Sequence, residues 1–196
     1  MSSNENHQHF KIYKPYGYLS QFINNQKTRK NKKLLGELFR FPSETMAIGR
    51  LDQDSEGLLL LTTSGKMSEK VRSKEVEKEY YVQVDGLIDE IAIQELKSGV
   101  EIGISGKKYM TRPCQAFILD TVPLFPERAK RIRDPRHGPT SWISITITEG
   151  KFRQVKKMTA AVGFPTLRLV RVRIGLETLT GLSSGEVIPV EDFKLH

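Results

Sequence analysis

A short polar loop brings together three charged side chains that could do chemistry. Asp52 lies between Arg50 and Asp54, shortly before the run of four leucines at Leu58–Leu61. Four consecutive leucines between glycines suit a strand that is buried on both faces, and such a strand is rigid. A loop leading into it can hold a carboxylate in a fixed place, as catalysis requires. Asp52 is therefore the candidate catalytic residue, although a loop aspartate can also be an ordinary turn or cap residue.

Two other functions could account for parts of this pattern. Asp52, Asp54 and Glu56 together could suggest a glycoside hydrolase. Such enzymes place two carboxylates on opposite sides of the scissile bond, about 5–9.5 Å apart, which neighbours in one loop rarely achieve. A non-catalytic RNA-binding protein that assists ribosome assembly is the second alternative, and it gives no reason for the loop.

An aromatic strand supplies a second candidate. Tyr80, Val82 and Val84 alternate within residues 77–84, which predicts a strand. Tyr80 and Tyr81 would then point to opposite faces, so only one of them can line a given binding site. Packing in the core is the ordinary role for such a tyrosine.

A basic helix is expected over residues 151–162. Its buried stripe would hold Phe152, Val155, Thr159 and Val162. Its opposite face carries Lys151, Arg153, Gln154, Lys156 and Lys157. Gly163 and Pro165 follow as cap and stop. A cation on this face could keep a nearby carboxylate ionised and oriented.

Periodicity elsewhere predicts an α+β chain. Further strands are expected at residues 10–13, 58–62, 100–104, 108–112, 115–119, 141–148 and 167–174. Further helices are expected at residues 34–39, 66–73 and 89–97, the last with Ile91, Ile93 and Leu96 as its apolar positions. Residues 141–148 alternate as a half-buried strand does, and the alternation of residues 167–174 slips between Leu169 and Val170, which predicts a bulge there.

The bulk composition favours a nucleic-acid partner. The chain has 196 residues and a formal net charge of +8, which suits one domain or two subdomains and a polyanionic ligand. Two basic segments, residues 26–33 and 123–139, are expected to contact RNA phosphates. The alternative is a solvated loop for the first segment and a disordered linker between strands for the second. Cys114 is the single cysteine, so no intrachain disulfide can form. Without a signal peptide or a long apolar run, the chain is expected to be cytoplasmic.

Five motifs resemble, in the same order, those of pseudouridine synthases of the RsuA/RluB/E/F type. They are K-P-x-G from Lys14, G-R-L-D-x-x-S-x-G-L-L-L-L-T from Gly49, K-x-Y from Lys78, E-G-K-F-R-Q-V-K-K-M from Glu149 and L-x-R from Leu169. Ser55 stands where the family often has threonine. The resemblance spans about residues 10–190 and implies that Asp52 is the essential carboxylate, that Tyr80 stacks on the target base and that Lys156 pairs with Asp52, with Arg153 as the second candidate. The implied substrate-binding residues are Arg50, Lys14, Lys78, Arg153, Gln154, Leu169 and Arg171.

The resemblance also implies a fold and a substrate. The fold would be α+β, with a mixed, mostly antiparallel sheet in two halves, flanking helices and a central cleft. One catalytic domain of two subdomains would span residues 9–192 after a disordered tail at residues 1–8, with no room for the S4 RNA-binding domain of many relatives. The enzyme would need no metal or other cofactor. It would act, as a monomer away from membranes, on one uridine of ribosomal RNA: 23S first, with 16S or transfer RNA as the alternative.

Overall fold

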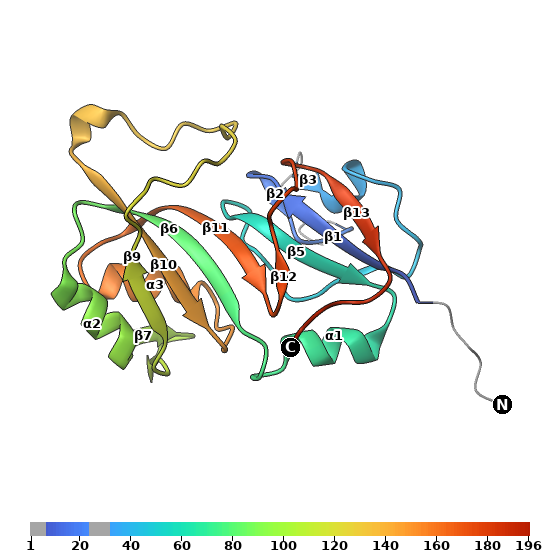
Figure 1. Ribbon diagram of the computed structural model, residues 1–196, viewed down its shortest axis with the longest axis horizontal. Coiled ribbons are helices and arrows are strands. Elements are labelled where there is room, and N and C mark those ends of the chain that lie inside the picture. Colours follow the sequence, from blue (N-terminus) through green and yellow to red (C-terminus); the bar gives the residue numbers. More distant parts are fainter. Residues whose placement is uncertain (1–6, 24–31) are drawn as a thin grey trace.

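The fold is organised around one sheet, which Figure 1 shows running across the whole molecule. The computed structural model describes residues 7–23 and 32–196, so the expected tail at residues 1–8 lies largely outside it, as does most of the expected basic loop at residues 26–33. In the described residues the sheet has nine strands, in the spatial order β13–β1–β5–β11–β6–β10–β9, with β12 on β11 and β4 on β5. Their bounds are β1 His9–Lys14, β4 Met46–Ala47, β5 Glu56–Thr62, β6 Lys78–Asp85, β9 Gln115–Ile118, β10 Thr140–Ile147, β11 Thr166–Ile174, β12 Glu177–Thr178 and β13 Val187–Val190.

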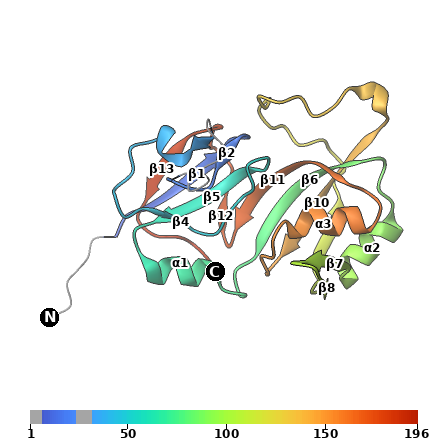
Figure 2. The ribbon, with the colours of Figure 1, turned by 180° about the vertical axis from the view of Figure 1, so that it is seen from behind.

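Helices cover the two halves of this sheet separately. The α-helices are α1 Gly65–Arg72, α2 Glu90–Ser98 and α3 Gln154–Ala161; the 3-10 helices are η1 Leu35–Glu37 and η2 Pro135–His137. Two small pairs complete the described fold, β2 Tyr18–Leu19 with β3 Lys33–Leu34 and β7 Glu101–Ile104 with β8 Lys107–Met110. In Figure 2, α2 and α3 lie on the half that contains β6, β10 and β9, and α1 lies beside the β5 half. No helix among the described residues is long and apolar enough to cross a membrane.

The two halves join where β5 and β11 pair in parallel. Val170 lies opposite Glu56 and Arg171 lies opposite Gly57, whereas the other strand pairs of this sheet are antiparallel. The guanidinium of Arg168 donates two hydrogen bonds, of 2.9 and 2.8 Å, to the Glu56 carboxylate, and both side chains are buried. The expected α+β class and the mostly antiparallel sheet in two halves are therefore confirmed.

The core explains why four leucines follow one another in β5. Leu58 and Leu60 belong to one apolar cluster, and Leu59 and Leu61 belong to another on the opposite face of the strand. The predicted strand buried on both faces is thus confirmed. A third cluster lies under α2 and α3, and it includes Tyr80 and Leu169.

Three expectations about helices were wrong in detail. α3 begins at Gln154, three residues later than expected, so Phe152 precedes the helix and is 68% exposed. In α2 the buried positions are Ala92, Ile93 and Leu96, whereas Ile91 is exposed because it turns away from β9. The helix expected at residues 34–39 is only the three-residue η1.

Two expectations about strands were also wrong in detail. Ser144 and Thr146 are buried like the isoleucines beside them, so β10 is covered on both faces, and Ser144 Oγ donates to Glu79 Oε1 over 2.9 Å. In β11 the register against β6 shifts between Thr166 and Arg168 and again between Arg171 and Arg173. Leu169 and Val170 lie between these shifts and are both buried, because this strand too is covered on both faces.

Gly57 offers a test of the junction between the halves. Its φ is +107°, and a Cβ built there would lie 2.3 Å from the Arg171 carbonyl oxygen. We predict that Gly57→Ala lowers the free energy of unfolding by about 2–4 kcal/mol, from backbone strain plus overpacking. Gly65→Ala is the control, since nothing lies within 4 Å of a Cβ there. Urea unfolding would measure both, and equal stabilities would contradict the prediction.

Candidate active site

The loop that carries Asp52 is clamped from two sides. It leads directly into β5, and Ser55 N donates to the Asp52 carbonyl over 3.0 Å. Ser20 Oγ donates to the Leu51 carbonyl over 2.8 Å and accepts from Leu51 N over 3.0 Å. Gly17 N in turn donates to the carbonyl of Gln53 over 2.8 Å. The carboxylate of Asp52 is therefore presented by a backbone with little freedom to move, as its predicted role requires.

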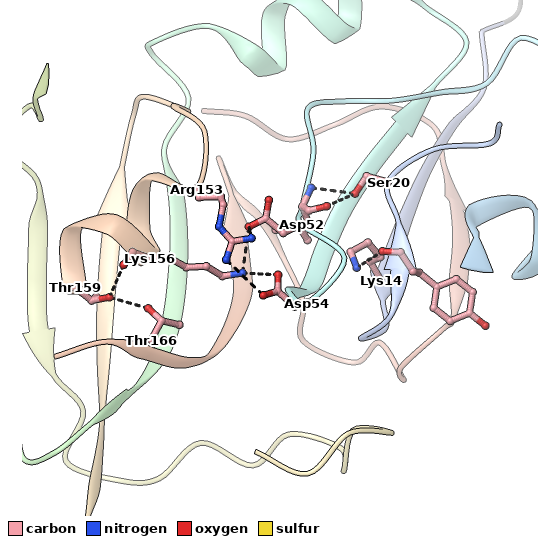
Figure 3. A network of polar contacts seen from close by, with 10 residues as sticks. Lys14, Ser20, Asp52, Asp54, Arg153, Lys156, Thr159 and Thr166 are labelled. Atoms are coloured by element: carbon pink, nitrogen blue, oxygen red, sulfur yellow. Dashed lines mark hydrogen bonds and ion pairs between the residues drawn. The ribbon is translucent and has the colours of Figure 1, made fainter. Parts of the chain in front are cut away.

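Two cations from the other half of the molecule face this loop. Lys156 Nζ lies 3.1 Å from Asp52 Oδ2 and 2.6 Å from Asp54 Oδ1. Arg153 Nη1 lies 3.5 Å from Asp52 Oδ2, and Arg153 Nη2 lies 3.6 Å from Asp54 Oδ2. Figure 3 shows both cations reaching from α3 and its start toward the two carboxylates. The predicted pairing of Lys156 with Asp52 is present, and both candidate cations take part in it.

The backbone just before α3 aims Arg153 at the aspartates. Arg153 has φ +52° and ψ +33°, a left-handed conformation that is uncommon for a residue other than glycine. Gln154 holds this turn, because its Oε1 accepts from Lys151 N over 3.0 Å and its Nε2 donates to Glu149 Oε1 over 2.9 Å. Strained backbone of this kind collects at functional sites, where the surrounding structure maintains it.

Gln154 departs from its expected position on the exposed face of the helix. It is 3% exposed, and the protein itself occupies its amide group. The side chain lines the cavity beside Asp52, but both its amide oxygen and its amide nitrogen already bond to the protein. It lies on the inner side of the turn because α3 starts later than periodicity predicted.

A cavity of about 400 Å³ opens beside Asp52, at the junction of the two halves. Tyr80 and Leu169 contribute apolar surface to it, and both are largely buried. Tyr81 lies on the opposite face of β6, with its ring 6.2 Å from that of Phe125. Asp52 and Tyr80 thus share one cavity, and of the two tyrosines Tyr80 is the one that lines it.

Basic side chains line the same cavity. Arg171 Nε donates to the Leu58 carbonyl over 2.7 Å, which ties β11 to β5, and its Cζ lies 6.0 Å from the centre of the Tyr80 ring. Arg171 Nη2 is buried and has no hydrogen-bond partner in the described part of the chain. Burial and the charge of Arg171 lower the pKa of Lys78 to about 8. Arg50 also lines the cavity and is exposed.

Lys14 does not fit its expected role as a substrate-binding residue. Its side chain is completely buried, does not line the cavity, and donates to the carbonyls of Pro15 and Tyr18 over 3.0 and 2.8 Å. Burial lowers its pKa to about 7, against the nearby charges of Glu56 and Asp54. Lys14 instead holds the turn whose Gly17 supports the Asp52 loop, because it ends β1 opposite Gly57 at the start of β5.

Charge and burial act in opposite directions on two carboxyl groups near the cavity. Partial burial would raise the pKa of Asp54, but the hydrogen bond and charge of Lys156, with Arg153, lower it. Burial likewise opposes ionisation of Glu149, yet its bonds from Tyr109 Oη at 2.5 Å, Arg112 N at 2.7 Å and Gln154 Nε2 lower its pKa. Both groups are therefore ionised at neutral pH.

The structure assembles most of the predicted residues and adds some that reasoning from sequence missed. Eight of them line the cavity: Arg50, Asp52, Lys78, Tyr80, Arg153, Gln154, Leu169 and Arg171. Lys156 reaches Asp52 from outside the lining. Ser55, Glu149 and Lys151 also line the cavity and were marked only as letters of motifs, whereas Arg72 had no signal in the sequence. Ser55 Oγ is buried without a partner among the described residues.

Comparison with known proteins places this geometry in context. A family model described as RNA pseudouridylate synthase matches residues 8–161. The chain is 44% identical over 167 residues to ribosomal large subunit pseudouridine synthase E of Xanthomonas axonopodis pv. citri, covering 84% of each protein. It is 41% identical to the Vibrio parahaemolyticus protein of the same name, covering 88% of this chain and 69% of that protein.

A solved structure shares the architecture. A crystal structure of a pseudouridylate synthase superposes with a TM-score of 0.74 at 28% sequence identity, covering 97% of this chain and 73% of the other. The fold and the motifs therefore lead to the same group of proteins.

The shared cation can be tested through the pKa of Asp54. We predict that Lys156→Met raises this pKa toward the ordinary aspartate range of about 3.9, because the main favourable charge is lost. A carbon-13 NMR titration of the carboxyl groups measures it. Lys157→Met is the matched control, since Lys157 Nζ donates to the Gly103 carbonyl instead. An unchanged Asp54 pKa in Lys156→Met would contradict the assignment.

The buried Lys14 predicts an unusual pH dependence of stability. Between pH of about 7 and about 10.5 the unfolded chain holds a proton on this lysine that the folded chain does not, so stability rises with pH in that window. The free energy of unfolding of the wild type should therefore rise from pH 7 to pH 9 relative to Lys14→Met. Lys107→Met, at an exposed strand position, controls for loss of a surface lysine. A constant difference between wild type and Lys14→Met would refute the expectation.

Proposed function

Because the chain belongs to the RNA pseudouridylate synthase family, and with it to the isomerases, we propose that it converts one uridine of 23S ribosomal RNA to pseudouridine, with Asp52 as the catalytic carboxylate. The relatives named large subunit pseudouridine synthase E support the choice of large-subunit RNA as substrate. The net charge of +8 suits a polyanionic substrate of this kind.

The observation that carries the proposal is the shared cavity of Asp52 and Tyr80. A uridine inside folded RNA is unreachable, so it must leave the stack and enter a pocket. Tyr80 offers an aromatic face for the uracil, and Leu169 offers an apolar contact beside it. The ribose of such a nucleotide would then face the Asp52 carboxylate at the rim, where Lys156 and Arg153 approach from the other half.

The chemistry needs a carboxylate that stays ionised next to a sugar. The bond from N1 to C1′ breaks, the uracil turns, and C5 bonds to C1′; a proton leaves C5 and N1 ends with one. Asp52 can serve either as the nucleophile or as the base on the sugar, and in both roles it must be an anion. Lys156 and Arg153 contact this carboxylate at 3.1 and 3.5 Å and hold it in position. Arg171, with a free Nη2 donor, and Lys78 can hold polar atoms of the bound nucleotide.

The setting follows from the same proposal. Ribosomal RNA is made and modified in the cytoplasm of bacteria such as the named relatives, so we place the protein there, acting as a monomer. The domain boundary that we propose, residues 9–192, contains all of the strands that form the sheet.

Substitution of Asp52 tests the proposal. We predict that Asp52→Asn lowers pseudouridine formation by about 10⁴-fold or more while RNA affinity is retained. Asp54→Asn is the matched control: its carboxylate pairs with Lys156 but does not line the cavity, so the rate should fall by about fivefold or less. Rates come from pseudouridine mapping of treated transcripts, and affinities come from filter binding.

The choice of transcript decides the substrate. Transcripts of 23S, 16S and transfer RNA would be compared with the wild-type protein, and 23S RNA should gain pseudouridine. Pseudouridine formed by Asp52→Asn would refute the catalytic assignment, and modification of 16S or transfer RNA alone would refute the substrate.

A further inference from the structure

A second cavity lies beneath the loop at residues 123–139, away from Asp52. Figure 1 shows this loop projecting beyond the strands of the sheet. The cavity, here called the loop cavity, has a volume of about 930 Å³. Its lining includes Gln83, Arg128, Lys130, Arg131, Arg133 and Arg168. Gln83 is three residues from Tyr80 in β6, so its side chain leaves the opposite face of the strand.

The loop cavity carries an excess of positive charge. Arg168 is neutralised by Glu56, and Arg133 Nη1 pairs with Asp85 Oδ1 over 2.8 Å. Arg128 and Lys130 form no ion pair within the described residues; Arg128 Nε donates to the Lys130 carbonyl over 2.8 Å. Glu127 also lines the cavity, so the two unpaired cations exceed the free carboxylates by one charge. This excess favours an anionic ligand, and a phosphate is the anion that RNA supplies.

Two hydrogen-bonding atoms of residues that line the loop cavity are buried without partners in the described part of the chain. They are Gln83 Oε1, an acceptor, and Arg133 Nε, a donor. The remaining groups of these side chains are occupied, since Gln83 Nε2 donates to Thr140 Oγ1 over 3.0 Å and Arg133 Nη2 donates to the carbonyls of Gly138 and Pro139 over 3.1 Å. Buried polar groups normally have partners, and leaving one unpaired is costly. A ligand that offers both a donor and an acceptor would satisfy them, as the edge of a nucleobase does.

The walls of the loop cavity are held in place on the sheet. The centre of the Phe125 ring lies 5.7 Å from the centre of the Trp142 ring. The guanidinium of Arg168 lies 5.4 Å from the centre of the Phe125 ring. Arg168 Nη2 also donates to the Pro126 carbonyl over 2.8 Å. Arg133 fixes the other leg of the loop through Asp85. The site is therefore formed before any ligand arrives, which reduces the ordering cost of binding.

The loop cavity is connected to the catalytic loop. The guanidinium of Arg128 stacks over the Tyr16 ring at 4.7 Å, and Tyr16 precedes Gly17, which bonds to Gln53 beside Asp52. Arg168, which lines the loop cavity, and Leu169, which lines the cavity beside Asp52, are neighbours in β11. The two cavities therefore lie on opposite faces of the same strands.

We propose that the loop cavity binds a second unstacked nucleotide of the substrate RNA, next to the target uridine in the folded RNA. Arg128 and Lys130 contact its phosphate, and Gln83 Oε1 and Arg133 Nε contact the edge of its base. A volume of about 930 Å³ lies within the usual range of small-molecule sites, about 300–1,000 Å³. This inference rests on the proposed function, because it takes RNA as the ligand.

A double-mutant cycle between protein and RNA tests the base contact. The probe is a 23S RNA fragment that carries the modified uridine, with a single abasic site placed in turn at each flanking position. In the wild type, one abasic position should weaken binding about tenfold. Gln83→Met, which keeps the size but loses the acceptor, should itself bind about tenfold more weakly and show no further loss at that position.

Thr140→Val is the matched control for the Gln83 substitution. It breaks the same Gln83–Thr140 hydrogen bond but leaves Gln83 Oε1 in the cavity, so the abasic penalty should persist. The inference is overturned if no flanking abasic position weakens binding, or if Gln83→Met leaves every penalty unchanged. Single-turnover pseudouridine formation by the wild type is measured in parallel. If the wild type forms none, the proposed function fails, and the binding cycle still reports on the cavity.

The phosphate contact is tested by salt dependence. Arg128→Gln with Lys130→Gln should lower affinity about tenfold and reduce the slope of log affinity against log salt by about 1–2. Lys66→Gln with Lys70→Gln removes the same charge from exposed positions of α1 and should leave the slope unchanged. Equal changes in the two pairs would show a general charge effect and would overturn the assignment of the phosphate contact.

Discussion

The parallel junction between β5 and β11 is the constraint on which the rest of the structure depends. It is short, with Glu56 opposite Val170 and Gly57 opposite Arg171. Three features strengthen it: the buried pair of Arg168 with Glu56, the bond from Arg171 to the Leu58 carbonyl, and a glycine where a Cβ would strike the backbone of β11. A buried ion pair is costly to break, because the remaining charge is left without a partner. The junction thus sets the position of one half of the molecule against the other.

This position matters because the candidate site draws on both halves. Asp52 comes from the loop before β5, whereas Lys156, Arg153 and Tyr80 come from elements across the junction. The interaction of Lys156 with two carboxylates keeps the cluster compact: it contacts Asp54 at 2.6 Å and Asp52 at 3.1 Å. Two anions that share one cation compete for it, so Asp54 helps to set how tightly the cation holds Asp52. Arg153, in its left-handed conformation, supplies a second positive charge from the same turn.

The face of the sheet opposite to Tyr80 carries the second cavity. Phe125, Arg168 and Trp142 anchor the base of the projecting loop, and the cations of that loop surround a cavity with unpaired polar atoms. Strand β6 therefore contributes Tyr80 to the cavity beside Asp52 and Gln83 to the loop cavity. Alternation along a strand makes this possible, because side chains three residues apart leave opposite faces.

The sequence by itself determined most of the elements and the candidate residues of the site. The leucine run predicted a strand buried on both faces, alternation predicted β6, and the ordered motifs selected Asp52, Tyr80 and Lys156, which the structure brings to one place. These are local signals, since period and motif are read along the chain. Only the tertiary structure decided that Lys14 is buried, that Gln154 faces inward, that Asp54 shares Lys156, and that the loop at residues 123–139 encloses a cavity. The physical reason is that burial and ion pairing depend on which distant segments meet, and that is set by the junction of β5 with β11 more than 100 residues apart in the chain.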